Sequence, residues 1–171
     1  WNTAAVTGMS HMFRGATSFN GNISSWNTAA VTGMSFMFDG ATSFNGNISS
    51  WNTAAVTHMG HMFKSATSFN QPLTHSGNSW NLENVTDMTN MFNGATGFSI
   101  ANYNIFLYSQ ANNSGINSNI TITVSSKYSD ATSRTYLTGT KNWTITDLGA
   151  SSDFVSTWAV GSGSFELPLK D

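Results

Sequence analysis

The sequence repeats itself with a period of 25 residues, and no other feature constrains the fold as strongly. The first two copies are identical at all but two positions, whereas the third has a longer tail and the fourth is more divergent. A period between roughly 20 and 50 residues is typical of solenoids, in which one unit cannot bury its apolar face alone and must stack on its neighbours. The four copies are placed at residues 1–25, 26–50, 51–79 and 80–104.

The apolar residues of the first copy predict the elements of one unit. They recur at i, i+3, i+4 and i+7 from Met9 to Ala16, which is the spacing of one face of a short helix. Thr7 is a suitable N-cap for this helix, and Gly15 can end it with a positive φ. Residues 21–26 begin at a turn-prone Asn-Gly pair and predict a short strand. The expected fold class is therefore an α/β solenoid, a leucine-rich-repeat-like right-handed coil of four repeats.

Recurring Asn residues fit this stacked arrangement. Examples are Asn2 with Asn27, and Asn20 with Asn45. Because neighbouring strands lie about 4.8 Å apart, equivalent Asn side chains of successive copies would form ladders and bond backbone groups of the next coil. We expect these residues to be structural rather than glycan-binding.

Two segments of the array carry a recognisable motif: WNTAAVTGMSHMFRGATSFNGNIS at residues 1–24 and WNLENVTDMTNMFNGATGFS at residues 80–99. They resemble the repeat of bacterial surface proteins related to BspA-like leucine-rich repeats. The resemblance covers residues 1–100. It implies a secreted or cell-surface protein with a role in adhesion, and it brings no catalytic residues with it. A secretion signal and an anchor are expected outside the given residues.

The segments after the array have different patterns. Residues 105–149 are interpreted as a C-terminal cap that covers the last open edge of the array, with Ser129 or Asp130 capping its helix. Residues 150–171 resemble a linker and the first strands of an immunoglobulin-like or PKD-like module. The cap is expected to contain a strand, a helix and a second strand, at residues 120–124, 130–138 and 143–146.

Charge and cysteine content exclude several functions. Only 8% of residues are charged and the net charge is -2, whereas about 25% is typical. Such a surface has no basic patch for phosphates, so no nucleic-acid partner is expected. The chain has no Cys and no apolar run of about 18 residues. We therefore expect no disulfide, no thiolate metal site and no direct membrane insertion.

No arrangement of residues predicts catalysis. His58 and His61 are three residues apart, but neither a Cys nor a nearby carboxylate completes a metal-ligand set. Glu83 and Asp87 lie near a predicted helix start, where they suit the helix dipole better than paired-carboxylate catalysis. No nucleophile elbow accompanies the Ser, His and Asp residues. We expect a non-enzyme without a metal or cofactor.

The copies differ mainly at positions 8, 11 and 14 of the repeat, on the outward side of the predicted helix. Variation on one face fits a diversified binding surface for a protein or carbohydrate of a host, a matrix or a neighbouring cell, although neutral drift predicts the same pattern. Phe36 is the most informative member, because an exposed Phe is suited to anchoring a contact. The candidate binding stripe consists of His11, Arg14, Phe36, Asp39, His58, His61, Lys64, Asp87 and Asn90.

Two other functions fit the same array. A structural spacer of a surface stalk would use contacts between identical copies, and an open N-terminal edge before Trp1 suits such self-association into a fibre. An ice-binding surface would need a flat, exposed array of Thr, for which the two candidate columns are Thr3, Thr28, Thr53 and Thr17, Thr42, Thr67, Thr96. Single Thr columns beside Trp do not promise such an array.

Overall fold

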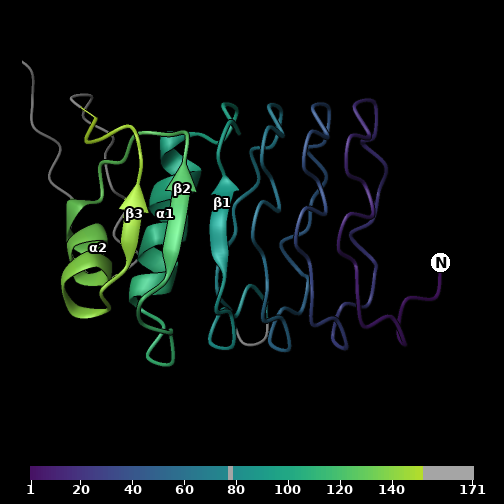
Figure 1. Ribbon diagram of the computed structural model, residues 1–171, viewed down its shortest axis with the longest axis horizontal. Coiled ribbons are helices and arrows are strands. Elements are labelled where there is room, and N and C mark those ends of the chain that lie inside the picture. The colour runs from purple at the N-terminus through teal and green to yellow at the C-terminus, as the bar shows by residue number, and fades with distance from the viewer. Residues whose placement is uncertain (77–78, 152–171) are drawn as a thin grey trace, which may run out of the picture.

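The computed structural model describes residues 1–76 and 79–151. The four copies form consecutive coils that lie side by side along the long axis of the molecule, and the helices gather at the C-terminal end (Figure 1). The elements are β1 Met88–Phe92, α1 Ile100–Ala111, β2 Thr121–Val124, α2 Ala131–Thr135, the π-helix η1 Tyr136–Thr140 and β3 Thr144–Thr146.

The prediction of a helix and a strand in each unit is wrong. Residues 10–15 form turns, and residues 21–26 form no strand. In the fourth copy, β1 occupies the position where the helix was expected. The backbone of His11 and Gly15 lies at φ 64° and 69°, in the left-handed region that a right-handed α-helix excludes.

A ladder of hydrogen bonds between coils explains why the helical spacing was misleading. The Met9 N–H donates to the Gly33 carbonyl at 2.9 Å and the Phe13 N–H donates to the Met37 carbonyl at 2.9 Å. Between these, the Met12 N–H donates within its own coil to the Met9 carbonyl at 3.3 Å. Local turns therefore alternate with bonds to the next coil, and this alternation gives inward residues a spacing that resembles that of a helix.

One continuous apolar core runs through the array. Phe38 stacks on Phe13 and on Phe63 at ring-centroid distances of 5.5 and 5.6 Å, and Phe63 stacks on Phe92 at 5.5 Å. The expected burial is confirmed in copies two to four. These copies contribute the fully buried residues Met34, Met37, Phe38, Phe44, Trp51, Met59, Met62, Phe63, Phe69, Trp80, Met88, Met91 and Phe92.

The first coil departs from this expectation because the described residues place a neighbouring coil on one side of it only. Met9 is buried, but Met12 is 45% exposed, and Phe13 and Phe19 are half-buried. The core therefore begins at an edge that the described residues leave uncovered.

One of the two expected Asn ladders is confirmed. The Asn45 N–H donates to Asn20 Oδ1 of the preceding coil at 2.9 Å. Asn2 instead accepts from the Ala4 N–H at 3.1 Å, which is an Asx turn within one coil, and its counterparts do the same. The neighbouring column of Thr3, Thr28 and Thr53 is buried, so it does not offer the exposed surface that ice binding would need. The second column, at Thr17, Thr42, Thr67 and Thr96, is mainly exposed, so ice binding stays a prediction for that column alone.

The cap contains the elements that the sequence predicts. β2 and β3 continue in parallel from β1, with Met88 paired to Ile122 and Ile122 to Ile145. The Asp130 side chain accepts from the Ser133 N–H at 3.0 Å and caps the helix. The second half of that helix is the π-helix η1, whose wider turn the sequence did not indicate.

Helix α1 was not predicted, and it runs across the expected boundary between residues 104 and 105. Its sequence is rich in Asn, Tyr and Ser, which are mediocre helix formers. Tertiary packing overrides this weak propensity, because Tyr103, Phe106 and Leu107 are buried against the core.

The expected immunoglobulin-like or PKD-like segment lies outside the described residues, apart from its first two positions. Within the described part of the chain, no helix is both long and apolar enough to span a bilayer.

Candidate functional site

The backbone repeats the same unusual conformation at one position of the stripe in every coil. His11, Phe36, His61 and Asn90 have φ values of 64°, 58°, 61° and 55°. A positive φ is uncommon for residues other than Gly, and for a bulky residue such as Phe it is an outlier that the surrounding structure must enforce. The inter-coil ladder on either side of this position holds the four residues in register.

Three of these residues form a stack of rings on the outside of the array. The His11 ring lies 4.9 Å from the Phe36 ring at an interplanar angle of 10°, and Phe36 lies 4.4 Å from His61 at 11°. The structure thus joins three predicted stripe residues into one column. Phe36 is half-buried rather than exposed as expected, because an imidazole covers each of its faces.

A charged column borders the rings. Arg14 Nε lies 3.1 Å from Asp39 Oδ2, and the Arg14 guanidinium carbon lies 5.2 Å from the centroid of the Phe36 ring. The Arg14 side chain is 56% exposed and that of Asp39 is 14% exposed. An exposed pair of this kind contributes little stability. The exposed Arg14 guanidinium is available to a ligand, whereas the Asp39 carboxylate is largely covered.

The surroundings of His61 perturb its imidazole. Burial lowers the pKa of His61, and the nearby Lys64 ammonium lowers this pKa further, against opposing effects of Asp39 and Asp87. His61 Nδ1 is buried and has no hydrogen-bond partner among the described residues. The neutral form of the ring is favoured, which suits stacking on Phe36.

The remaining stripe residues do not join the ring stack. His58 Nδ1 lies 2.8 Å from Thr57 Oγ1, and Asp87 Oδ1 accepts from the Thr89 N–H at 2.9 Å. His58 and Asp87 pair through a backbone bridge, while the Asn93 side chain donates to Asn90 Oδ1 at 3.4 Å. The predicted stripe is therefore a compact patch at coils one to three with a separate polar end at coil four.

The cap holds a polar cluster that sequence reasoning missed. The Tyr103 hydroxyl and Arg134 Nε both donate to Asp147 Oδ2, at 2.9 and 2.8 Å. The Arg134 guanidinium carbon also lies 4.7 Å from the Tyr128 ring centroid. The members are far apart in the sequence, so no local pattern pointed to them. Because the Asp147 side chain is only 3% exposed, we interpret the cluster as a group of contacts that stabilise the cap rather than as a binding surface.

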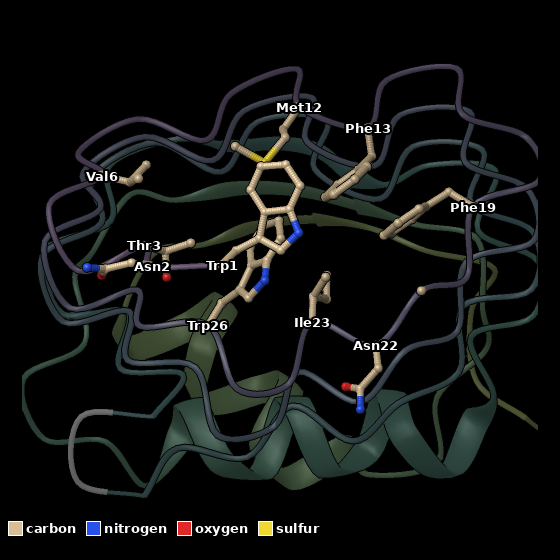
Figure 2. Close-up of a pocket in the computed structure, with 11 residues that line it drawn as sticks. Trp1, Asn2, Thr3, Val6, Met12, Phe13, Phe19, Asn22, Ile23 and Trp26 are labelled. Carbon is tan, nitrogen blue, oxygen red and sulfur yellow. The ribbon is translucent and has the colours of Figure 1, made fainter.

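The third notable feature is an apolar hollow at the N-terminal end of the array, with a volume of about 520 Å³. Figure 2 shows the side chains that line it, which belong to the first coil and to the start of the second. They include Trp1, Met12, Phe13, Phe19, Ile23 and Trp26. The described residues contain no cluster of three or more His, Asp or Glu side chains that could hold a metal ion.

A family model described as "Mycoplasma protein of unknown function, DUF285" matches residues 1–106, which include all four copies and the first half of α1. No curated protein and no solved structure matches the chain. Since the match covers more than half of the sequence, the chain belongs to the DUF285 family, a bacterial repeat family.

Proposed function

We propose that this chain is a non-catalytic module of a bacterial surface protein, and that its array binds a protein or carbohydrate ligand through the stripe. The observation that carries the proposal is the ring stack of His11, Phe36 and His61 bordered by the charges of Arg14 and Asp39. The proposal also takes the coils as a solenoid of the BspA-like type, located outside the cell, with its signal and anchor beyond the given residues.

The ring stack combines two properties that binding surfaces need. Its edges and neighbouring charges offer apolar and polar contacts side by side, as aromatic residues and Arg do in interfaces. The backbone N–H of each ring residue donates to a carbonyl of the next coil, so little conformational entropy is lost when a ligand binds. A rigid, mixed surface of this kind favours a binding role.

The distribution of sequence differences supports the same location. The first two copies differ only where His11 becomes Phe36 and Arg14 becomes Asp39. Both differences lie in the ring stack or in the adjacent charged column, while every inward residue is unchanged. The core residues are identical in these two coils, and both differences lie in the outer patch.

The test is to probe a panel of immobilised glycans and matrix proteins with the folded chain. We expect Ala at Phe36, His61 and Lys64 together to weaken binding at least about tenfold, because interface anchors of this type often contribute more than about 1.4 kcal/mol. A matched control replaces Ser18, Ser43 and Ser68, which are exposed and equivalent in three coils. Equal binding by both variants would place the ligand elsewhere.

The triple Ala variant also needs a stability check. Phe36 is half-buried between two rings, so its removal should cost about 1 kcal/mol, in line with the value of an aromatic pair. Binding is therefore measured well below the unfolding temperature of the variant. Loss of binding in a chain that is still folded supports the proposal.

The second candidate function is a structural spacer in a stalk or filament. The specific observation in its favour is that the same backbone bonds and ring contacts recur from coil to coil, as an extended stalk would need. If the chain binds none of the immobilised glycans or matrix proteins, the spacer function is favoured over the binding function.

A further inference from the structure

The cations of the array are confined to one position of the repeat. Arg14 and Lys64 are the only Lys or Arg residues in the sequence of residues 1–104, and both occupy position 14, next to the ring stack. Asp39 holds the same position in the coil between them. With Lys64 included, these three residues make up the charged column. Surface charges select the charge of a partner, so this column bears on the kind of ligand that the stripe takes.

The backbone holds the charged column in register. The Gly15 N–H donates to the Asp39 carbonyl at 2.7 Å, and the Gly40 N–H donates to the Lys64 carbonyl at 2.8 Å. Coils joined by such bonds lie about 4.8 Å apart. The two cationic side chains therefore leave the backbone about 10 Å apart, at twice this spacing, with a carboxylate midway between them.

Both cations keep hydrogen-bond donors free for a ligand. Arg14 uses only Nε, which donates to Asp39, so its two terminal nitrogens donate to no described residue. The Lys64 ammonium forms neither a hydrogen bond nor an ion pair with a described residue. Lys64 lies in an internal coil and is still partly exposed, so this face of the array is open there too. Each cation is therefore suited to a carboxylate, which accepts charge-assisted hydrogen bonds.

Asp39 restricts where negative groups of a ligand can lie. Its Oδ2 accepts from Arg14, and its Oδ1 accepts from no described residue. The side chain is 14% exposed, so a small donor group can reach the free oxygen. A hydroxyl or an amide N–H of the ligand would bond to it, whereas a second negative group would be repelled. The column thus favours a ligand with the order negative, neutral, negative.

We infer that the stripe binds a linear glycan in which an acidic sugar alternates with a neutral one, an inference that rests on the proposed binding function. Two linked pyranose rings span about the distance between the cations, so the carboxylates of alternate sugars reach Arg14 and Lys64 in register. The neutral sugar between them presents hydroxyl or N-acetyl N–H groups to Asp39. The edges of the ring stack, which lie beside the column, contact the C–H groups of the sugars.

Other ligands match the charged column less well. In an extended acidic peptide, side chains on one side repeat at about 6.7 Å, which is out of step with cations two coils apart. A polyuronate carries a negative group on every sugar, so one of these groups would face Asp39. A neutral glycan leaves both cations without a partner.

The test compares the dissociation constants of four soluble probes by isothermal titration calorimetry. The probes have equal numbers of units and are an oligosaccharide of alternating glucuronate and N-acetylglucosamine, a chitin oligosaccharide, an oligogalacturonate and an oligoglutamate peptide. We expect the alternating glycan to bind most tightly and the neutral chitin probe at least about tenfold more weakly, because chitin forms neither ion pair. Oligogalacturonate should also bind more weakly than the alternating glycan, although it carries more charge.

Single substitutions separate the roles of the charges. Lys64→Gln should weaken binding of the alternating glycan about threefold to fivefold, the range of one exposed ion pair. Lys127→Gln is the matched control, because it removes an exposed cation of the cap and should leave the affinity unchanged. Asp39→Asn should raise the affinity for oligogalacturonate by a similar factor, since the repulsion is removed. Thermal unfolding checks that each variant is folded.

The outcomes distinguish this inference from the proposed function. Tightest binding of the alternating glycan, lost in part in Lys64→Gln but not in Lys127→Gln, supports the inference. Tighter binding of oligogalacturonate or oligoglutamate overturns it, because total charge rather than spacing would then decide. Equal binding of chitin, or no binding of any of the four probes, also overturns it. If Ala at Phe36, His61 and Lys64 still weakens binding of another glycan or a matrix protein, the proposed function stands and only the alternating acidic ligand is wrong.

Discussion

The array and the cap of this molecule are stabilised in different ways. In the array, the same backbone bonds and ring contacts recur from coil to coil. In the cap, each contact occurs once, as in the cluster of Tyr103, Arg134 and Asp147. The cost of a substitution in the array should therefore depend on how many coils flank it. In the cap, this cost should depend on which partner is lost.

The largest effect is expected when the central aromatic column is broken in an internal coil. Phe38→Ala should lower the free energy of unfolding by about 3 to 5 kcal/mol, the usual cost of emptying a buried aromatic site. Phe13→Ala changes the equivalent residue of the edge coil, which is only half-buried, and should cost clearly less. Urea denaturation measures both variants. Equal costs would contradict the idea that the number of flanking coils sets the effect.

A smaller effect is expected in the cap. Arg134→Met leaves the buried Asp147 carboxylate without its cation and should cost about 3 kcal/mol. Tyr103→Phe removes one hydrogen bond to the same carboxylate and should cost about 1.5 kcal/mol. Thermal unfolding of both variants is compared with that of Lys127→Met, which changes an exposed residue of the cap. If Arg134→Met behaves like Lys127→Met, the cluster does not stabilise the cap.

The smallest effect is a dependence of stability on pH in the ring stack. Burial lowers the pKa of His61 below its ordinary value of 6.5, with Lys64 adding to the shift. The unfolded chain therefore takes up a proton at a higher pH than the folded protein does, and stability falls as the pH drops below about 6.5.

A substitution isolates this pH effect. His61→Phe introduces the residue that the second copy already holds at the same position. The variant should lose less stability between pH 7 and pH 5 than the unmodified protein, as measured by urea denaturation. If the variant and the unmodified protein show the same pH dependence, the pKa of His61 does not differ between the folded and the unfolded chain.

The sequence predicted which residues point inward, but not the backbone that carries them. The periodic Met and Phe residues identified the core because burial depends on side-chain pattern. Their helical spacing arises here from turns that alternate with inter-coil bonds. The left-handed backbone at His11 and Phe36 gives no signal in the residue type, so it could not have been anticipated.

Only part of the candidate site could be predicted from the sequence. Comparing the copies located His11, Phe36 and His61, and the structure joins them into one stack. That stack half-buries Phe36, an effect of neighbouring coils which no single copy reveals. The cap shows the opposite case. Local signals identified β2, α2 and β3, whereas α1 depends on tertiary packing and the cluster at Asp147 on residues distant in the sequence.

Residue-resolved amide hydrogen exchange on the unmodified chain tests the central claim, that the coils are joined by a ladder rather than built from helices. The ladder predicts strong protection at Phe38 and Phe63, whose N–H groups donate to the next coil at 2.8 and 2.9 Å. It also predicts fast exchange at Thr7, which has no such neighbour among the described residues. Fast exchange at Phe38 and Phe63 while Ile122 stays protected would contradict the account.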